Sequence, residues 1–238
     1  MIYLGIDDTD MPGTPGTNQL ARRLIAALPA GFGLRVALRH QLLLDSRVPY
    51  TSKNGSASLL LDAAPGRRAA DLLPVLRREM RQWYQPGSDP GLCAADRVPV
   101  ALGEFGRRCQ REVVRQDEAR ALARAHGVHL EGLGGTEDGV IGALAAVGLL
   151  AGGDDGRVVH LPGWSWPDGF AGPRPLAAVL GRGVDEIRQA TGDEPVTDGV
   201  VDVGKHLRPS FRGGRVVLFV EPCGNGATPT AWRAVKLP

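Results

Sequence analysis

The feature that most constrains the fold is an alternation of strand-like and helix-like patterns over the first 150 residues. Short apolar runs alternate with segments whose apolar residues recur at helical spacing. The patterns predict strands at 1–6, 57–61, 98–102 and 128–130, one or two strands over 34–44, and helices after Thr17 and at 69–83, 104–114, 116–126 and 140–150. Such alternation is typical of a sheet covered by helices. We therefore expect an α+β (mixed α/β) fold, a sheet flanked by helices.

The composition changes near residue 160, where prolines become frequent. Beyond it the patterns predict a short helix at 184–190 and strands near Val200, at 216–220 and at 232–235. We expect a first domain over 1–160 and a smaller α+β subdomain over 161–238, either separate or part of the same unit.

The composition excludes several classes of protein. With 43% hydrophobic residues and a formal net charge of +2, the 238 residues are typical of a soluble globular chain. The longest uncharged apolar run, 140–153, is shorter than the 18–20 residues, roughly, that a membrane span needs. No secretion signal is visible, and the three cysteines form no CxxC pair, which predicts a cytoplasmic protein with neither a disulfide framework nor a zinc site.

An acidic turn follows the first strand, with Asp7, Asp8 and Asp10 within four residues. Carboxylates this close repel one another, and a cation between them lowers that cost. Magnesium suits the pattern because it takes one or two carboxylates and bridges substrate phosphates. If the strand continued, Asp8 and Asp10 would share a face, which makes them the first choice as metal ligands. The alternative is a solvated acidic turn.

Two polar loops are candidates for contact with a phosphate. The first, Gly13-Thr14-Pro15-Gly16-Thr17-Asn18, opens a helix for which Thr17 is a natural N-cap, and backbone N–H groups there favour an anion. The second, 48–57, holds Lys53, one of only three lysines, followed by Asn54-Gly55. A lone lysine suits a phosphate or a carboxylate, whereas the plain alternative is a surface turn.

A glycine-rich loop, Gly134-Gly135-Thr136-Glu137-Asp138-Gly139, runs into an apolar helix rich in glycine and alanine. Small residues in that helix permit close backbone packing. The loop is a candidate for phosphate or ribose contact, and a tight turn before a core helix is the equal alternative.

Together these segments resemble the N-terminal part of the archaeal tRNA-isoleucine agmatidine synthetases, the TiaS family. The resemblance covers roughly residues 1–150. It rests on Gly5-Ile6-Asp7-Asp8-Thr9-Asp10, Thr17, Val48-Pro49-Tyr50, Lys53-Asn54-Gly55-Ser56-Ala57, Asp89-Pro90-Gly91 and 135–148.

The resemblance implies a kinase-like domain with a ferredoxin-like element that uses ATP and Mg²⁺. Asp7, Asp8 and Asp10 would hold magnesium and the ATP phosphates, and Thr17 corresponds to the threonine that the family phosphorylates. Catalysis would fall to Thr17, Asp8 and Lys53. The nucleotide would contact Asp7, Asp10, Gly16, Thr17, Asn18, Lys53, Asn54, Gly135, Thr136, Glu137 and Gly139.

The chain also departs from the family pattern. Gly16 stands where the family has cysteine, Asn18 replaces a second threonine, and Thr51 replaces a basic residue. The family continues into an oligonucleotide-binding domain and a zinc ribbon that handle tRNA, and these 238 residues contain no zinc-ligand spacing.

Three functions follow from these observations. The first is an ATP- and Mg²⁺-dependent phosphotransferase or ligase-like enzyme that activates an oxygen of a small-molecule or nucleotide-like acceptor. The second is a compact tRNA-modifying enzyme that needs a partner for RNA binding, although net charge and domain content give tRNA little support. The third is a nucleotide-binding sensor with weak turnover. The sequence names neither the acceptor nor an oligomeric state.

Overall fold

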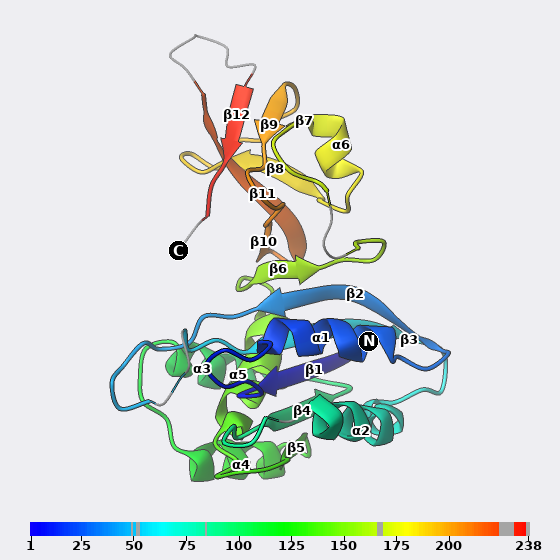
Figure 1. Cartoon of the computed structure of the whole chain (residues 1–238), viewed down its shortest axis with the longest axis vertical. Helices are drawn as coiled ribbons and strands as arrows, with labels where there is room; N and C mark the ends of the chain where they lie inside the picture. The colour runs from blue at the N-terminus through cyan, green and yellow to red at the C-terminus, as the bar shows by residue number, and fades with distance from the viewer. Residues whose placement is uncertain (49, 51–52, 84, 166–168, 224–230, 237–238) are drawn as a thin grey trace. The chain divides into compact units, whose positions relative to one another are not determined.

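A computed structural model describes the chain except residues 49, 51–52, 84, 166–168, 224–230 and 237–238 (Figure 1). The chain divides into two compact units, Met1–Gly152 and Gly153–Pro238. The domain assignment made from the sequence, with its boundary near residue 160, stays a prediction. Among the described residues no helix is both long and apolar enough to cross a membrane.

The sheet of the first unit is antiparallel and has β1 at its centre. The strands lie in the order β5 (His129–Gly132), β4 (Gly91–Ala95), β1 (Ile2–Asp7), β3 (Ala57–Ala63) and β2 (Phe32–Arg39). Because β1 pairs with β3 on one side and β4 on the other, its backbone is bonded along its length and its last residue is fixed in position.

Helices cover this sheet in two layers (Figure 1). One layer is α1 (Thr17–Ala26) with α2 (Leu73–Trp83), which follows a 3₁₀ turn at Ala69–Leu72. In the other, α5 (Gly139–Gly152) lies on β1 and β4, with α3 (Val100–Cys109) and α4 (Gln116–Ala125) against it. The α+β class and the sheet flanked by helices are thus confirmed.

Strand periodicity assigns the residues of β1 to these layers. Ile2, Leu4 and Ile6 are fully buried on one face, and Gly5 lies on the other, against α5. A Cβ atom at Gly5 would overlap the Ala143 carbonyl, so only glycine lets the helix approach this closely. Asp7 falls on the same face as Gly5, and β1 therefore ends with a carboxylate under α5.

The second unit has its own sheet. Its strands lie in the order β6 (Arg157–His160), β10 (Ser210–Arg212), β11 (Arg215–Pro222), β12 (Ala231–Ala234), β9 (Val200–Asp202) and β7 (Pro173–Pro175). A further strand, β8 (Glu186–Gln189), pairs in parallel with β11, and the short helix α6 is Leu176–Leu180. The predicted strands near Val200, at 216–220 and at 232–235 correspond to β9, β11 and β12.

Two predicted elements are wrong. The segment 98–102 is not a strand, because Pro99 is the N-cap of α3 and Val100 begins the helix. Close packing against α5 selects this helix, since a Cβ at Gly106 would contact Ala145 O and Leu149. The predicted helix at 184–190 is instead β8, where pairing with β11 overrides a local sequence that is polar and helix-like.

The strand structure predicted over 34–44 is also too long, because β2 ends at Arg39. Beyond it the chain bonds to other segments: Leu42 N–H donates to Asn54 O, and Leu43 N–H donates to Cys109 O, at 2.9 and 3.0 Å. These bonds fix Leu42 and Leu43 as a wall of the cavity described below.

Candidate functional site

The acidic turn begins where β1 ends. The strand stops at Asp7, and Asp8 takes a left-handed conformation with φ of 49°. The strand therefore does not continue to Asp8 and Asp10, and the condition under which these two residues would share one face is not met. Asp and Asn adopt this region more readily than most residues, so the turn suits the residue found there.

Asp7 is held under the first turn of α5. A Cβ at Gly142 would overlap the Asp7 Oδ2 atom, and a Cβ at Gly139 would lie 3.0 Å from Asp8 Cβ. The glycines that begin α5 therefore make room for both acidic side chains. The spacing of Gly139 and Gly142, three residues apart, brings both to the same side of the helix.

A small polar cavity of about 50 Å³ gathers side chains from the acidic turn, the start of α1 and the lysine loop. Its lining is Asp7, Asp8, Asp10, Thr17, Tyr50, Lys53, Asn54 and Gly55. The structure thus brings together three carboxylates, one hydroxyl and one lysine that the sequence named separately. Gly16 lies beside it, because a Cβ there would be 3.8 Å from Asp10 Oδ2.

Thr17 is tied to the acidic turn by its hydroxyl. Its Oγ1 donates to Asp10 Oδ1 at 3.1 Å and accepts from Thr9 Oγ1 at 3.2 Å. The prediction that Thr17 caps α1 is wrong: Gly16 is the N-cap, no side chain caps the helix, and Thr17 is its first residue. The hydroxyl is consequently turned to the acidic turn rather than to the helix backbone.

Burial and mutual repulsion raise the proton affinity of two of the carboxylates. Desolvation, followed by the charge of Asp8, raises the pKa of Asp7 to about 7. Desolvation, followed by the charge of Asp89, raises the pKa of Asp8 to about 6. The site holds more negative charge than its own cations balance, and a bound cation would relieve this.

Arg39, at the end of β2, is a basic residue of this site that sequence analysis missed. Its guanidinium lies against Gly55, where a Cβ would overlap Nη2, and its charge acts to lower the pKa of Asp7. Burial in turn lowers the pKa of Arg39. No motif marks this residue, because only the pairing of β2 with β3 brings it to the lysine loop.

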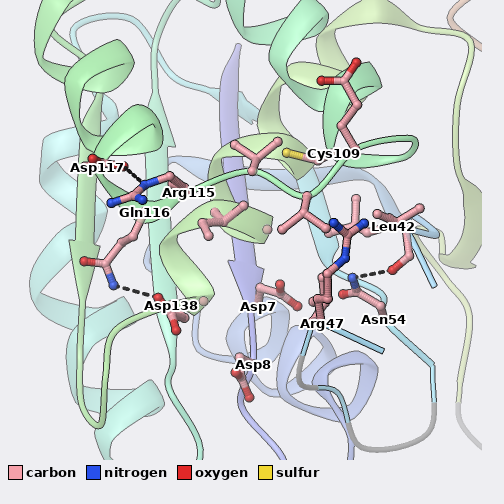
Figure 2. Close-up of a pocket in the computed structure, with 18 residues that line it drawn as sticks. Asp7, Asp8, Leu42, Arg47, Asn54, Cys109, Arg115, Gln116, Asp117 and Asp138 are labelled. Carbon is pink, nitrogen blue, oxygen red and sulfur yellow. Dashed lines mark hydrogen bonds and ion pairs between the residues drawn. The ribbon is translucent and has the colours of Figure 1, made fainter. Parts of the chain in front are cut away.

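A larger cavity of about 520 Å³ adjoins the small one and shares Asp7, Asp8 and Asn54 with it. Figure 2 shows Asp7 and Asp8 between Arg47 on one side and Gln116 and Asp138 on the other, with Asn54 on the Arg47 side. Its further lining is Leu42, Leu43, Val48, Cys109, Glu112, Val113, Val114, Arg115, Asp117, Gly139, Ile141 and Gly142. The lining mixes apolar side chains with charged and polar ones, and the volume is within the range typical of small-molecule sites.

The glycine-rich loop is anchored by Asp89, which sequence analysis named only within a motif. The Asp89 carboxylate accepts the Thr136 N–H, and the Asp89 carbonyl accepts the Gly139 N–H at 2.9 Å. Gln116 Nε2 donates to Thr136 O and to Asp138 Oδ1, at 2.8 and 3.0 Å. These contacts fix the backbone that leads into α5.

Some predicted residues do not line either cavity. Gly135, Thr136 and Glu137 lie in the anchored loop, and the Glu137 carboxylate pairs with Arg120. Asn18, in the first turn of α1, is half-buried and also lies outside both linings. Pro49 and Thr51 fall outside the described residues. The predicted roles of all these residues stay predictions.

The carboxylates do not form a ready-made metal cage. Within the described part of the chain, no three or more His, Cys, Asp and Glu side chains are grouped as a metal site. Magnesium needs fewer, because it is bound by one or two carboxylates together with waters and phosphates. Asp7 and Asp8, crowded and desolvated, have the donor chemistry for that arrangement.

Cys109 lines the larger cavity but is not suited to nucleophilic chemistry. It is almost fully buried, and desolvation raises the pKa of its thiol to about 12. At neutral pH the sulfur is therefore protonated and acts as part of the apolar wall.

Comparison with known proteins finds similarity only at the level of structure. No protein-family profile and no curated protein matches the chain. A solved tRNA fluorescent labelling enzyme is similar, with 25% identity and a TM-score of 0.54, over 62% of this chain and 35% of that one. The structure of apo TiaS, a tRNAIle2 agmatidine synthetase, is also similar, with 24% identity and a TM-score of 0.53, over 62% of this chain and 35% of that one.

TiaS in complex with tRNA(Ile2) and ATP is similar over a longer stretch, 76% of this chain and 43% of that one, with 21% identity and a TM-score of 0.54. The chain thus spans less than half the length of each of these solved proteins. The similarity that the sequence motifs predicted is confirmed as a similarity of fold.

Proposed function

We propose that this chain binds ATP at the acidic turn and uses it to activate an oxygen of an acceptor, as a phosphotransferase or ligase-like enzyme. The observation that carries the proposal is the pair of adjoining cavities, one small and charged, the other large and partly apolar, which share Asp7 and Asp8. In this proposal the charged cavity takes phosphate groups of the nucleotide, and the larger cavity takes its nucleoside or the acceptor.

The charged cavity suits a phosphate with its cation. Asp7 and Asp8 would hold Mg²⁺, which would neutralise charge on a transferring phosphoryl group. Their raised pKa values, about 7 and about 6, are those expected of carboxylates that lack this partner. Asp10 holds the Thr17 hydroxyl by a hydrogen bond, which leaves it in a positioning role.

Thr17 and two basic residues complete the proposed phosphate site. Asp10 accepts the Thr17 hydroxyl proton at 3.1 Å, which directs an oxygen lone pair of Thr17 away from the carboxylate. Lys53 lies in the same cavity and supplies a movable positive charge. Arg39, whose guanidinium lies against Gly55, supplies a second positive charge.

Isothermal titration with ATP and Mg²⁺ tests the proposal. Asp8→Asn keeps the left-handed turn, because Asn tolerates positive φ, and it removes one carboxylate charge. The matched control is Asp62→Asn, an exposed carboxylate on the neighbouring strand β3. We expect wild type and the control to bind alike and Asp8→Asn to bind at least about tenfold more weakly, the loss of one charge-assisted contact. Equal binding by all three proteins contradicts the proposal.

A second candidate is modification of tRNA, favoured by the similarity to TiaS solved with tRNA(Ile2) and ATP. It predicts retention of tRNA on a gel at low salt, with an affinity that falls steeply as salt rises. Absence of any shift at low salt refutes it and leaves a smaller acceptor.

A third candidate is a nucleotide sensor with weak turnover. Mass spectrometry after incubation with ATP and Mg²⁺ distinguishes such a sensor from an enzyme that transfers a phosphoryl group. A phosphate on Thr17 that is absent from Thr17→Val indicates competence for phosphoryl transfer. ATP binding without any modified residue favours the sensor.

A further inference from the structure

The second unit contains a separate cavity whose charged lining is entirely basic. This cavity, of about 280 Å³, lies between the loop after β9 and the end of β12. Its lining is Val203, Gly204, Lys205, His206, Arg208, Ala234, Val235 and Lys236. Two of the three lysines of the chain meet here, in a protein whose basic residues are otherwise nearly all arginine.

Within the described part of the chain, the cations of this cavity are not balanced by acids. No described carboxylate lines it, and Lys205, Arg208 and Lys236 form no ion pair with any described residue. The nearest acidic residue in sequence, Asp202, accepts the Gly204 N–H at 2.9 Å and does not line the cavity.

Another cavity of the same unit provides the contrast. There Arg188 and Arg215 both pair with Glu186, and Arg188 also pairs with Asp193. Arg188 and Arg215, which line that cavity beside these acids, are therefore matched by carboxylates. The basic cavity differs, and its uncompensated charge favours an anion.

The backbone around the basic cavity is held in place. Val203 N–H donates to Gly172 O at 3.1 Å, and Val235 N–H donates to Phe219 O at 2.9 Å, which extends the contact of β12 with β11. Leu207 is buried between the exposed Lys205 and Arg208 and anchors the loop. The floor is apolar, and charges beside such a surface act more strongly than charges surrounded by water.

We propose that this basic cavity, formed by Lys205, Arg208 and Lys236 over Val203 and Val235, is a binding site for a phosphate group, distinct from the acidic turn of the first unit. Lysine suits phosphate as a compact charge with three donors, and arginine adds a planar pair of donors. The phosphate belongs either to the backbone of a single-stranded RNA or to a small phosphorylated molecule. The inference does not depend on the proposed ATP site.

The test uses the full chain labelled with ¹⁵N, so that the site of binding is located and binding at the acidic turn is told apart. Pyrophosphate is titrated first, and a short oligouridylate second, while the amide signals of residues 203–206 and 234–236 are followed. The variant is Lys205→Ala with Lys236→Ala, both exposed side chains. The control is Arg215→Ala with Arg233→Ala, which removes the same charge from exposed arginines outside the basic cavity.

We expect pyrophosphate to shift these amides in wild type and in the control. We expect its affinity for the lysine variant to be at least about tenfold lower than its affinity for wild type. If RNA is the source, oligouridylate binds more tightly than pyrophosphate, and its salt slope falls by about 1.4 in the lysine variant, about 0.7 for each charge. If oligouridylate is no tighter, the ligand is a small phosphorylated molecule. Unshifted amides in wild type, or equal losses in variant and control, overturn the proposal.

Discussion

Replacement of Asp7 by Asn should stabilise the first unit at alkaline pH, because it removes a carboxylate that the fold desolvates. Burial raises the pKa of Asp7 from 3.8 to about 7. The free energy of unfolding of wild type therefore falls as pH rises from about 4 to about 7, because over that range the native state binds more protons than the unfolded chain. Above about pH 7 the whole penalty is present.

The size of the effect follows from the pKa difference. The pKa of Asp7 differs by about three between the unfolded and folded states. Because one pKa unit corresponds to about 1.4 kcal/mol, the upper limit on the loss of stability at pH 8 is about 4 kcal/mol. The side chain of Asp7 keeps part of its surface in contact with solvent, so water screens part of this charge. We therefore expect Asp7→Asn to raise the free energy of unfolding by about 1–3 kcal/mol at pH 8. At pH 5 the carboxyl of the native state is already protonated, and the gain should fall to less than half.

Urea unfolding at pH 5 and pH 8 without divalent cations measures this difference. Amide hydrogen exchange in β1 assigns the change to the first unit, since the second unit unfolds with its own signals. The control is Asp62→Asn, on an exposed carboxylate of β3, which should give the same change at both pH values. A gain for Asp7→Asn that does not depend on pH refutes the reasoning, because the effect would then come from packing and not from charge.

Three further changes test the geometry of the site. Gly142→Ala should destabilise the first unit by about 1–3 kcal/mol in urea unfolding, because its Cβ overlaps Asp7 Oδ2, whereas Gly152→Ala, with open space around it, should not. Asp89→Asn should speed amide exchange at Thr136 and leave β3 unchanged, because it weakens the bond that anchors the loop. Iodoacetamide at pH 8 should label exposed Cys223 and spare buried Cys93 and Cys109, as peptide mass spectrometry would show.

The sequence was sufficient for the parts of the site that carry local patterns. The acidic turn follows a strand of alternating apolar residues, Thr17 comes directly after a loop rich in glycine, and Lys53 lies in a polar loop. These patterns depend on neighbours in the chain, and the structure brings the three segments to one cavity.

The remaining parts of the site depend on contacts between distant residues. Arg39 reaches the site only through the pairing of β2 with β3, and Gln116 only through the contact of α4 with the glycine-rich loop. Strand β4 is similar: its residues Gly91–Ala95 are all buried, but alanine and glycine give no strand pattern. Tertiary packing supplies these parts, and a single sequence does not display it.

The glycines of helix α5 make room for the acidic turn and the segment beside it. The helix contains four glycines in 14 residues, and each glycine inside a helix costs about 1 kcal/mol relative to alanine. Alanine at Gly139, Gly142 or Gly148 would collide with Asp89 O, Asp7 or Leu102 O. Gly139 and Gly142 leave the space that the acidic turn and the segment beside it occupy. The helix is therefore less stable than one with alanine at these positions, and the carboxylates can lie under it. A solvated acidic turn needs no such arrangement, so these glycines support the proposed binding site at Asp7 and Asp8.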